Sequence, residues 1–253
     1  MVKKFKKSLG QNFLRDDVVL DKISSSISLF NCNKIIEIGP GDGVLTRNLL
    51  ANNLPVSVIE YDRDLIPKLE SEFSQFQNFS ILNEDILKVD LQHLCDKNSV
   101  IVGNLPYNIS SQIILKLLES RVDYQSAVFL IQKELAQRFC TNSKKSTKIS
   151  LLAHFFSDID QLFDVSPDAF IPQPKVTSTL IRIMPHKRNS KRLEQYIELK
   201  KILESCFANP RKQIKKSLIQ LGVSSEKLSF KSSSRPDDLA LQDYFEILDI
   251  SEK

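Results

Sequence analysis

The residues best suited to chemistry form one short stretch, Asn104-Leu105-Pro106-Tyr107, directly after an apolar segment that ends at Gly103. The side-chain oxygen of Asn104 and the backbone carbonyl of Pro106 can each accept one N–H hydrogen bond. Proline has no N–H to donate and stiffens the loop, and Tyr107 offers an aromatic face on which a base can stack. Together these groups could hold an aryl amine, whose lone pair is otherwise delocalised into its ring, and aim that lone pair at a methyl group.

The Asn-x-Pro-Tyr tetrapeptide resembles the catalytic loop of methyltransferases that act on exocyclic amines. No strong general base is needed in such a reaction, because the methylated ammonium is acidic and can lose its proton to water or a carbonyl. Catalysis would come mainly from positioning and electrostatics. We therefore take residues 104–107 as the candidate catalytic loop.

A second set of residues suits a nucleoside. Three of the six glycines lie within five residues, in Gly39-Pro40-Gly41-Asp42-Gly43, and Glu60 follows Gly39 by 21 residues at the end of the next strand. A carboxylate at this distance can accept both ribose hydroxyls. Asp85 could accept a hydrogen bond from an adenine amino group, with Ile86 against the ring. The loop matches neither the G-x-G-x-x-G nor the P-loop pattern, so S-adenosylmethionine is favoured over NAD and nucleoside triphosphates.

The elements that must position these residues alternate between strands and helices. Such alternation predicts an α/β fold with a mostly parallel sheet covered on both faces, and a pair of late strands joined by a Pro-rich connection is expected to pair antiparallel at one edge. The predicted strands are 34–38, 56–60, 79–82, 99–102, 126–131, 158–165 and 177–183.

The pattern changes near residues 184–191, where we place a domain boundary between residues 1–186 and 187–253. Beyond it, apolar residues repeat at helical spacing up to Phe207 and again from Ile214 to Leu221, where Gly222 is a plausible C-cap. Arg235-Pro236-Asp237-Asp238 opens a last helix. The C-terminal part is therefore predicted to be a small, all-helical domain.

Composition narrows the class of protein. The chain has 253 residues, 42% of them hydrophobic, and a net charge of +4; its mean hydropathy is −0.18. Apolar stretches are too short for a membrane span, and the basic N-terminus has no apolar core typical of a signal peptide. Four cysteines without a CxxC pair and three histidines without ligand spacing predict no metal site and fit a reducing cytoplasm.

The small net charge is unevenly distributed. It is −5 over residues 31–125 (8 basic, 13 acidic), +3 over 1–30 (6 basic, 3 acidic) and +4 over 187–253 (14 basic, 10 acidic). Basic runs near both ends and in one internal loop could follow a phosphate backbone, or could simply be solvated surface. The candidate RNA-binding residues are Lys3, Lys4, Lys6, Lys7, Lys144, Lys145, Arg211, Lys212, Lys215 and Lys216.

Over nearly its whole length the chain resembles the ribosomal RNA adenine dimethyltransferases of the bacterial small subunit. The matching motifs are Ser8–Leu14, Glu37–Gly41, Asn104–Ser110, Gln132–Glu134, Phe170–Val176, Asn209–Lys212 and Arg235–Leu239. The resemblance implies a Rossmann-like class I methyltransferase fold with a seven-stranded sheet, and an S-adenosylmethionine site that includes Asn12, Leu14, Gly39, Glu60, Asp85 and Asn104. We add Gln11, Gly41 and Ile86 to this site, since Gln11 and Asn12 could close over cofactor and target.

The resemblance also implies the reaction. Two adjacent adenosines in the 3′-terminal hairpin loop of 16S rRNA would each become N6,N6-dimethyladenosine, and the enzyme would take part in late small-subunit assembly and affect kasugamycin sensitivity. Phe170 would be a second stacking face opposite Tyr107, or else a buried phenylalanine of the core. The protein would act in the cytoplasm on the small subunit or its precursor, and would be a monomer when free.

Two departures concern RNA contacts. The family usually has a second consecutive proline where Gln173 stands, and a Tyr-Gly-x-Leu-Ser-like segment where this chain has residues 146–150. The first would alter how Phe170 packs on the target base. The second falls on a basic loop.

Three other functions compete with this interpretation. A dimethylase of 23S rRNA that confers antibiotic resistance shares the Asn-x-Pro-Tyr loop, although Leu105 and the Arg235–Leu239 motif favour the small-subunit type. A DNA adenine methyltransferase would share the same chemistry. A ribosome-assembly factor could keep the fold and act by binding alone.

Overall fold

The computed structural model describes residues 11–28, 30–120, 122–140, 145–186 and 190–251. The chain divides into two compact units. Unit 1 comprises Met1–Ala136 and Ile159–Pro185, and unit 2 comprises Gln137–Asp158 and His186–Lys253. The chain passes from unit 1 to unit 2 for the last time between Pro185 and His186, one residue before the domain boundary predicted from the sequence. Residues 137–158, which the sequence placed in the first domain, belong to unit 2.

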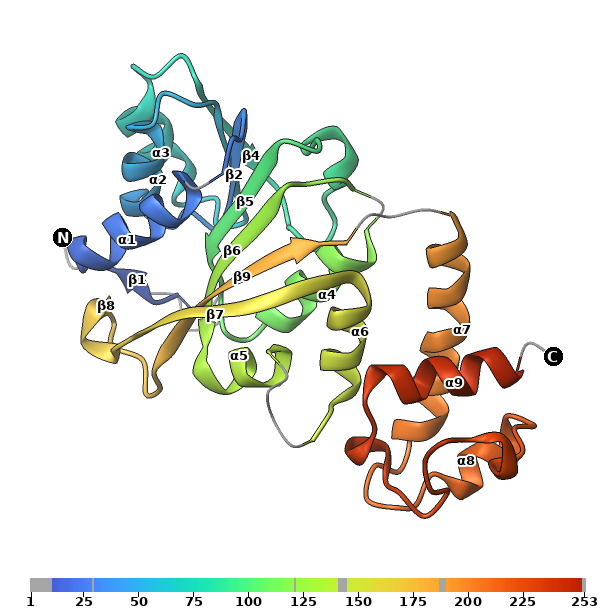
Figure 1. Cartoon of the computed structure of the whole chain (residues 1–253). Coiled ribbons are helices and arrows are strands. Elements are labelled where there is room, and N and C mark those ends of the chain that lie inside the picture. The colour runs from blue at the N-terminus through green and yellow to red at the C-terminus, as the bar shows by residue number, and fades with distance from the viewer. Residues whose placement is uncertain (1–10, 29, 121, 141–144, 187–189, 252–253) are drawn as a thin grey trace. The chain divides into compact units, whose positions relative to one another are not determined.

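A seven-stranded sheet in the order β4-β3-β2-β5-β6-β9-β7 forms the centre of unit 1 (Figure 1). The five strands from β2 to β6 are parallel, and β9 runs antiparallel to β6. The late strands β9 and β7 lie side by side at one edge. The bounds are β2 (Lys34–Ile38), β3 (Val56–Glu60), β4 (Phe79–Asn83), β5 (Ser99–Asn104), β6 (Ser126–Gln132), β7 (Ser157–Val165) and β9 (Ser178–Pro185). The mostly parallel sheet expected from the sequence is confirmed.

The central strands are buried on both faces, as their continuous apolar sequences require. Ile35 and Ile36 of β2 are both fully buried, and so are successive residues of β5 and β6. Because successive side chains of a strand point to opposite faces, a strand buried throughout needs cover on both sides.

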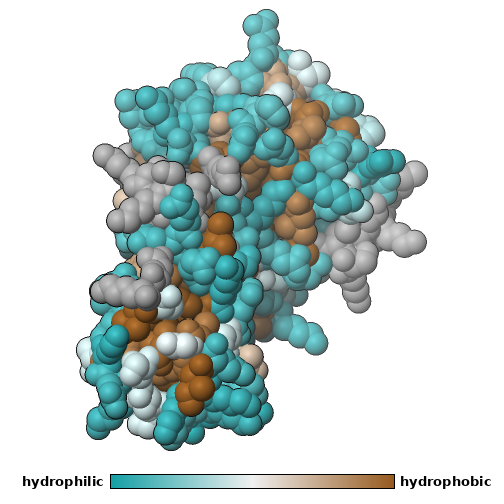
Figure 2. Space-filling model, turned by 90° about the vertical axis from the view of Figure 1, so that its right-hand side faces the viewer, coloured by the Kyte–Doolittle hydropathy of each residue, from teal (hydrophilic) through white to brown (hydrophobic). Residues whose placement is uncertain are grey.

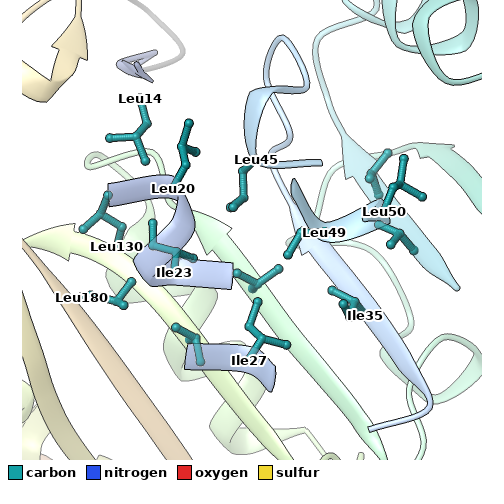
Figure 3. Packing of buried hydrophobic residues seen from close by; sticks show 14 of the residues in the cluster. Leu14, Leu20, Ile23, Ile27, Ile35, Leu45, Leu49, Leu50, Leu130 and Leu180 are labelled. Atoms are coloured by element: carbon teal, nitrogen blue, oxygen red, sulfur yellow. The ribbon is translucent and has the colours of Figure 1, made fainter. Parts of the chain in front are cut away.

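Helices α1 (Asp17–Ser28), α2 (Val44–Leu50) and α3 (Ile66–Phe73) pack on one face of this sheet. Leu20, Ile23 and Ile27 have the spacing of one helix face, and Figure 3 shows them turned toward strand residues that include Leu130 and Leu180. Among the described residues up to 140, the remaining α-helices are α4 (Ser110–Glu119) and α5 (Lys133–Phe139).

A two-stranded antiparallel sheet was not predicted. It joins β1 (Phe13–Leu14) to β8 (Phe170–Ile171), with Leu14 opposite Phe170. Two-residue strands carry no periodicity, so the sequence alone could not reveal them. The pairing ties the start of the described chain to the Pro-rich connection that precedes β9.

Four α-helices lie wholly among the described residues of unit 2: α6 (Lys148–Phe156), α7 (Ser190–Phe207), α8 (Lys215–Gln220) and α9 (Leu241–Ser251). Phe156 packs on Tyr196 of α7 with ring centroids 4.7 Å apart. Gly222 adopts φ +70° and ends α8 in a Schellman motif, with Val223 N–H donating to the Leu218 carbonyl at 2.9 Å. The predicted helical C-terminal region and its glycine cap are thus confirmed.

Apolar side chains reach the surface of unit 2 in the lower part of Figure 2, among hydrophilic ones. Among the described side chains of this unit, Ile197 and Ile219 are the most exposed large apolar ones. None of the helices in the described part of the chain is long and apolar enough to cross a membrane.

Candidate active site

A cavity of about 300 Å³ opens at the carboxyl ends of β2, β3, β4 and β5. From β2 the chain continues to β3 on one side, whereas β5 lies on the other side of β2. This change of direction is where open α/β sheets bind ligands, because the loops after the strands separate there. The cavity is lined by Gln11–Leu14, Glu37–Asp42, Val44, Leu45, Ile59–Tyr61, Glu84–Leu87, Asn104, Pro106, Asn108, Ile109 and Ile113.

The glycine loop between β2 and α2 turns in a way that other residues adopt at a cost. Gly39, Gly41 and Gly43 have φ of +68°, +60° and +87°. At Gly41 a Cβ atom would lie 2.8 Å from the ring of Phe13. The loop is therefore shaped by backbone conformation and by close contact with the segment around β1.

Gly103 has a different role. A Cβ atom there would lie 2.6 Å from the backbone oxygen of Ile38. Glycine lets β5 approach the end of β2 closely, which brings the catalytic loop next to the glycine loop.

The carboxylate of Glu60 is buried at the end of β3. Its Oε2 accepts from Gly41 N–H at 3.2 Å and its Oε1 from Asp62 N–H at 2.7 Å. Burial raises the pKa of Glu60, while the backbone donors of Asp62 and Gly41 oppose that rise. Each carboxylate oxygen can accept more than one hydrogen bond, so this group still has acceptor capacity toward the cavity.

Glu37 is a site residue to which the sequence analysis gave no role. It lies within β2, 1% exposed, and accepts a hydrogen bond from Thr46 Oγ1 at 2.6 Å. Burial raises the pKa of Glu37 to about 8. The side chain is therefore mainly protonated at neutral pH, and only its place inside the sheet could have signalled this.

After β4, Asp85 and Ile86 line the cavity together, as predicted for neighbours of an adenine ring. Asp85 Oδ1 accepts from Leu87 N–H at 2.9 Å, which fixes the carboxylate. Tyr61 also lines the cavity and is 62% exposed. Tyr61 was not among the site residues predicted from the sequence, although it directly follows Glu60.

The candidate catalytic loop begins at the end of β5. Asn104 Nδ2 donates to the Asn12 carbonyl at 2.8 Å, and no hydrogen bond to Asn104 Oδ1 occurs among the described residues. The Pro106 carbonyl accepts from Ile109 N–H at 3.1 Å. Since a carbonyl oxygen has two lone pairs, one remains for a further donor. Two acceptors thus line one cavity.

Leu105 and Tyr107 do not line the cavity. Leu105 is buried, and its N–H donates to the Leu130 carbonyl at 3.1 Å. Tyr107 is half-buried between the lining residues Pro106 and Asn108, with its hydroxyl 2.6 Å from Ser178 Oγ. Leu105 therefore anchors the loop to β6.

The placement of Phe170 corrects the sequence analysis. Its side chain is 2% exposed and belongs to the hydrophobic core, because β8 pairs with β1 and directs the ring inward. The ring offers no free face for a base in this structure. The expectation that Phe170 stacks opposite Tyr107 is wrong for this conformation.

The segment 11–15 lies across the site and is held by side chains from loops after two strands. Gln11 Nε2 donates to Asp62 Oδ2 at 2.9 Å, and Arg15 forms a two-fold ion pair with the buried Asp42. Together with Asn12, which binds Asn104, these contacts link the glycine loop, the end of β3 and the catalytic loop.

The candidate RNA-binding residues are only partly covered by the structure. Lys3, Lys4, Lys6, Lys7 and Lys144 lie outside the described residues. The Lys145 ammonium lies 2.7 Å from Asp237 Oδ2, in an ion pair within unit 2. The exposed basic residues of unit 2 include Arg211, Lys212, Lys215 and Lys216.

Comparisons with known proteins agree with this arrangement. A sequence model of the family described as "Ribosomal RNA adenine dimethylase" matches residues 2–253. A protein of Marinobacter nauticus named "Ribosomal RNA small subunit methyltransferase A" is 36% identical over 250 residues, which cover 97% of this chain and 91% of that protein. A protein of Francisella tularensis with the same name is 34% identical, and the match covers 95% of each chain.

Two solved structures share the fold. A dimethyladenosine transferase from Plasmodium falciparum aligns with a TM-score of 0.77 at 24% identity, over 93% of this chain and 96% of that one. The 23S rRNA methyltransferase ErmE aligns with a TM-score of 0.74 at 21% identity, over 96% and 100%.

Proposed function

The chain belongs to the ribosomal RNA adenine dimethylases, and from this premise we propose that it dimethylates the N6 amines of two adjacent adenosines in the 3′-terminal hairpin loop of 16S rRNA. The methyl donor is S-adenosylmethionine. Relatives that match nearly the whole chain carry the name "Ribosomal RNA small subunit methyltransferase A", which supports the small subunit as the source of the substrate.

The observation that carries the proposal is that two kinds of residue share one cavity. The candidate nucleoside-binding residues Gly39, Glu60 and Asp85 line it together with the amine-accepting Asn104 and Pro106. A methyl donor and an acceptor amine bound there would meet without any rearrangement of the sheet.

The residues present fit the cofactor. Glu60 keeps acceptor capacity for ribose hydroxyls, Asp85 for an adenine amino group, and the apolar side chain of Ile86 suits the flat face of the base. Gln11, Asn12, Leu14 and Gly41 complete the enclosure. The bound cofactor supplies an electrophilic methyl group.

Asn104 and Pro106 then prepare the nucleophile. Asn104 Oδ1 and the Pro106 carbonyl each accept one N–H of the adenine amine, which reduces delocalisation of the lone pair and directs it at the methyl group. Leu105 holds the loop to β6, and Tyr107 supports the base. The proton leaves to water or a carbonyl, and the pocket accepts N6-methyladenine for the second transfer.

The target adenosine must leave any paired stem before its amine can enter the cavity, so a loop is the natural substrate. We assign RNA binding to the basic residues Lys3, Lys4, Lys6, Lys7, Lys144, Lys145, Arg211, Lys212, Lys215 and Lys216, and RNA or ribosome contact to residues 187–253 as a domain. The enzyme acts as a monomer in the cytoplasm during late small-subunit assembly, and its loss would change kasugamycin sensitivity.

A methyl-transfer assay with competing substrates tests the proposal. Small-subunit particles that lack the modification, large-subunit RNA and duplex DNA are each offered with labelled S-adenosylmethionine. We expect label in the small-subunit particles alone. Transfer only to large-subunit RNA would support the 23S rRNA alternative, and transfer to duplex DNA would support a DNA methyltransferase.

Binding to the particles without any transfer would point to an assembly factor that acts by binding alone. An Asn104→Ala variant is the matched reference for that outcome, since it is expected to bind but not to transfer.

A further inference from the structure

Two side-chain hydrogen bonds hold the catalytic loop from outside. One joins Asn104 to the Asn12 carbonyl. The other joins the Tyr107 hydroxyl to Ser178 Oγ, with the two oxygen atoms 2.6 Å apart. This second contact brings the catalytic loop after β5 together with the first residue of β9, 71 positions later in the chain.

Ser178 is a rigid partner. Its side chain is fully buried, and β9 pairs there with Gln132 of β6. The neighbouring Thr179 Oγ1 donates to Asp164 Oδ1 at 2.6 Å, and Lys133 Nζ lies 2.5 Å from the other oxygen of that carboxylate. Because its backbone and its neighbour are both held, the Ser178 hydroxyl has little freedom to move.

Without the hydrogen bond to Ser178, the Tyr107 ring would be free to turn. Its backbone belongs to a turn closed by the Ile109 N–H to Pro106 carbonyl bond, and its ring turns about two side-chain torsions. The bond to Ser178 fixes the far end of the ring and therefore its plane. The Tyr107 phenol is protonated at neutral pH, as tyrosines ordinarily are, and burial raises its pKa further.

The buried position of Phe170 makes the plane of Tyr107 more important. Of the two rings considered for stacking, Tyr107 is the half-buried one and Phe170 lies in the core. The ring that supports a target base sets the orientation of that base, and a misplacement of about 1 Å at a reacting group can cost about 100-fold in rate.

We infer that Ser178 is a positioning residue: through its hydrogen bond to the Tyr107 hydroxyl it sets the plane of the ring on which the target adenine rests. This rests on the proposed function, since the role needs a base at Tyr107. Ser178 itself touches neither the cofactor residues nor the candidate amine acceptors among the contacts described above.

A double-mutant cycle in kcat tests the inference. Tyr107→Phe keeps the ring and removes the hydroxyl, and Ser178→Ala removes the partner. We expect each single variant to lower kcat for methyl transfer to small-subunit particles about 5- to 10-fold, the size of one lost hydrogen bond. The double variant should fall no further than either single variant, within about twofold, and KM for S-adenosylmethionine should not change.

Ser126→Ala is the matched control, because Ser126 is an equally buried serine at the start of β6 whose hydroxyl donates to the Ile183 carbonyl. It should change stability but not kcat. Losses that multiply in the double variant, or an unchanged kcat in Ser178→Ala, would overturn the inference. If Ser178→Ala does not fold, an unchanged kcat in Tyr107→Phe overturns it as well.

Failure of the proposed function and failure of the positioning role of Ser178 give different results. A wild-type enzyme that transfers no methyl group to these particles contradicts the proposed function. Wild-type transfer combined with independent effects of Ser178 and Tyr107 contradicts only the positioning role.

Discussion

At the scale of single residues, the chemistry depends on which atoms are already engaged. The amide nitrogen of Asn104 is bound to the Asn12 carbonyl, so the amide cannot turn over without losing that bond. The oxygen is thereby left as the acceptor for an amine. The sequence singled out Asn104 as a candidate amine acceptor, but not the carbonyl that orients it, because Asn12 is 92 residues away.

Two substitutions of Asn104 test the separate roles of its side-chain oxygen and nitrogen. Asn104→Ala should lower kcat at least about 100-fold, because a positioned hydrogen-bond partner of the reacting group is lost. Asn104→Asp keeps an acceptor but places a second oxygen against the Asn12 carbonyl, which favours the protonated acid. We therefore expect its activity, relative to wild type, to increase as pH falls. A pH profile of kcat that parallels wild type would contradict this orientation.

Glu37 gives a prediction about stability. The folded protein keeps the Glu37 proton up to a pKa of about 8, whereas the ordinary value is 4.5. Unfolding therefore releases a proton between these values, and the free energy of unfolding should fall with rising pH by up to about 1.4 kcal/mol per pH unit. Glu37→Gln, which stays neutral, should flatten this slope in denaturant titrations between about pH 5 and pH 8.

The matched control is Glu70→Gln, at an exposed carboxylate of α3. This variant should retain the wild-type slope. If the free energy of unfolding of the Glu37→Gln variant depended on pH as steeply as that of the wild type, Glu37 would not be the group that binds the proton.

At the scale of elements, the strands were more predictable than the segments that cover the site. The short segments 34–38 and 56–60, rich in β-branched residues and each followed by a turn or helix signal, predict β2 and β3 to the residue. The pairing of β1 with β8 depends on contacts between distant short segments. That pairing buries Phe170 in the core, and the sequence alone left open whether this ring is a stacking face or a core residue.

The segment 11–15 should act as one clasp over the cofactor site. Arg15→Gln removes the ion pair with the buried Asp42, so we expect a loss of about 1–2 kcal/mol in stability and 5- to 10-fold weaker binding of S-adenosylmethionine, measured by calorimetry. Arg47→Gln is the control, because Arg47 is exposed where it pairs with Glu72 on the surface. Equal effects of the two changes would contradict the clasp.

At the scale of the whole molecule, the distribution of charge along the chain is more informative than the net charge. The segment 31–125, which provides most of the cavity, carries −5, and residues 187–253 carry +4. The sequence therefore predicts that an anionic partner is attracted to the basic C-terminal part and not to the segment that provides most of the cavity. It could not show that Lys145 pairs with Asp237, because this ion pair forms only in the folded unit.

Neutralising four exposed basic residues of unit 2 tests the RNA-binding role. Replacing Arg211, Lys212, Lys215 and Lys216 by Gln should lower the slope of log K against log salt concentration by about 3 for the 16S rRNA 3′ region. Binding of S-adenosylmethionine should not change, since the cavity lies within unit 1. The double variant Lys88→Gln and Lys97→Gln in unit 1 is the control. A slope equal to that of wild type would contradict the assignment.

The central claim is the identity of the modified nucleotides. The most direct measurement is mass spectrometry of the 3′-terminal fragment of 16S rRNA, after incubation of unmodified small-subunit particles with the enzyme and S-adenosylmethionine. The account predicts two methyl groups on each of two neighbouring adenosines in the hairpin loop, and none with Asn104→Ala. Methylation confined to another nucleotide, or an unmodified fragment, would contradict it.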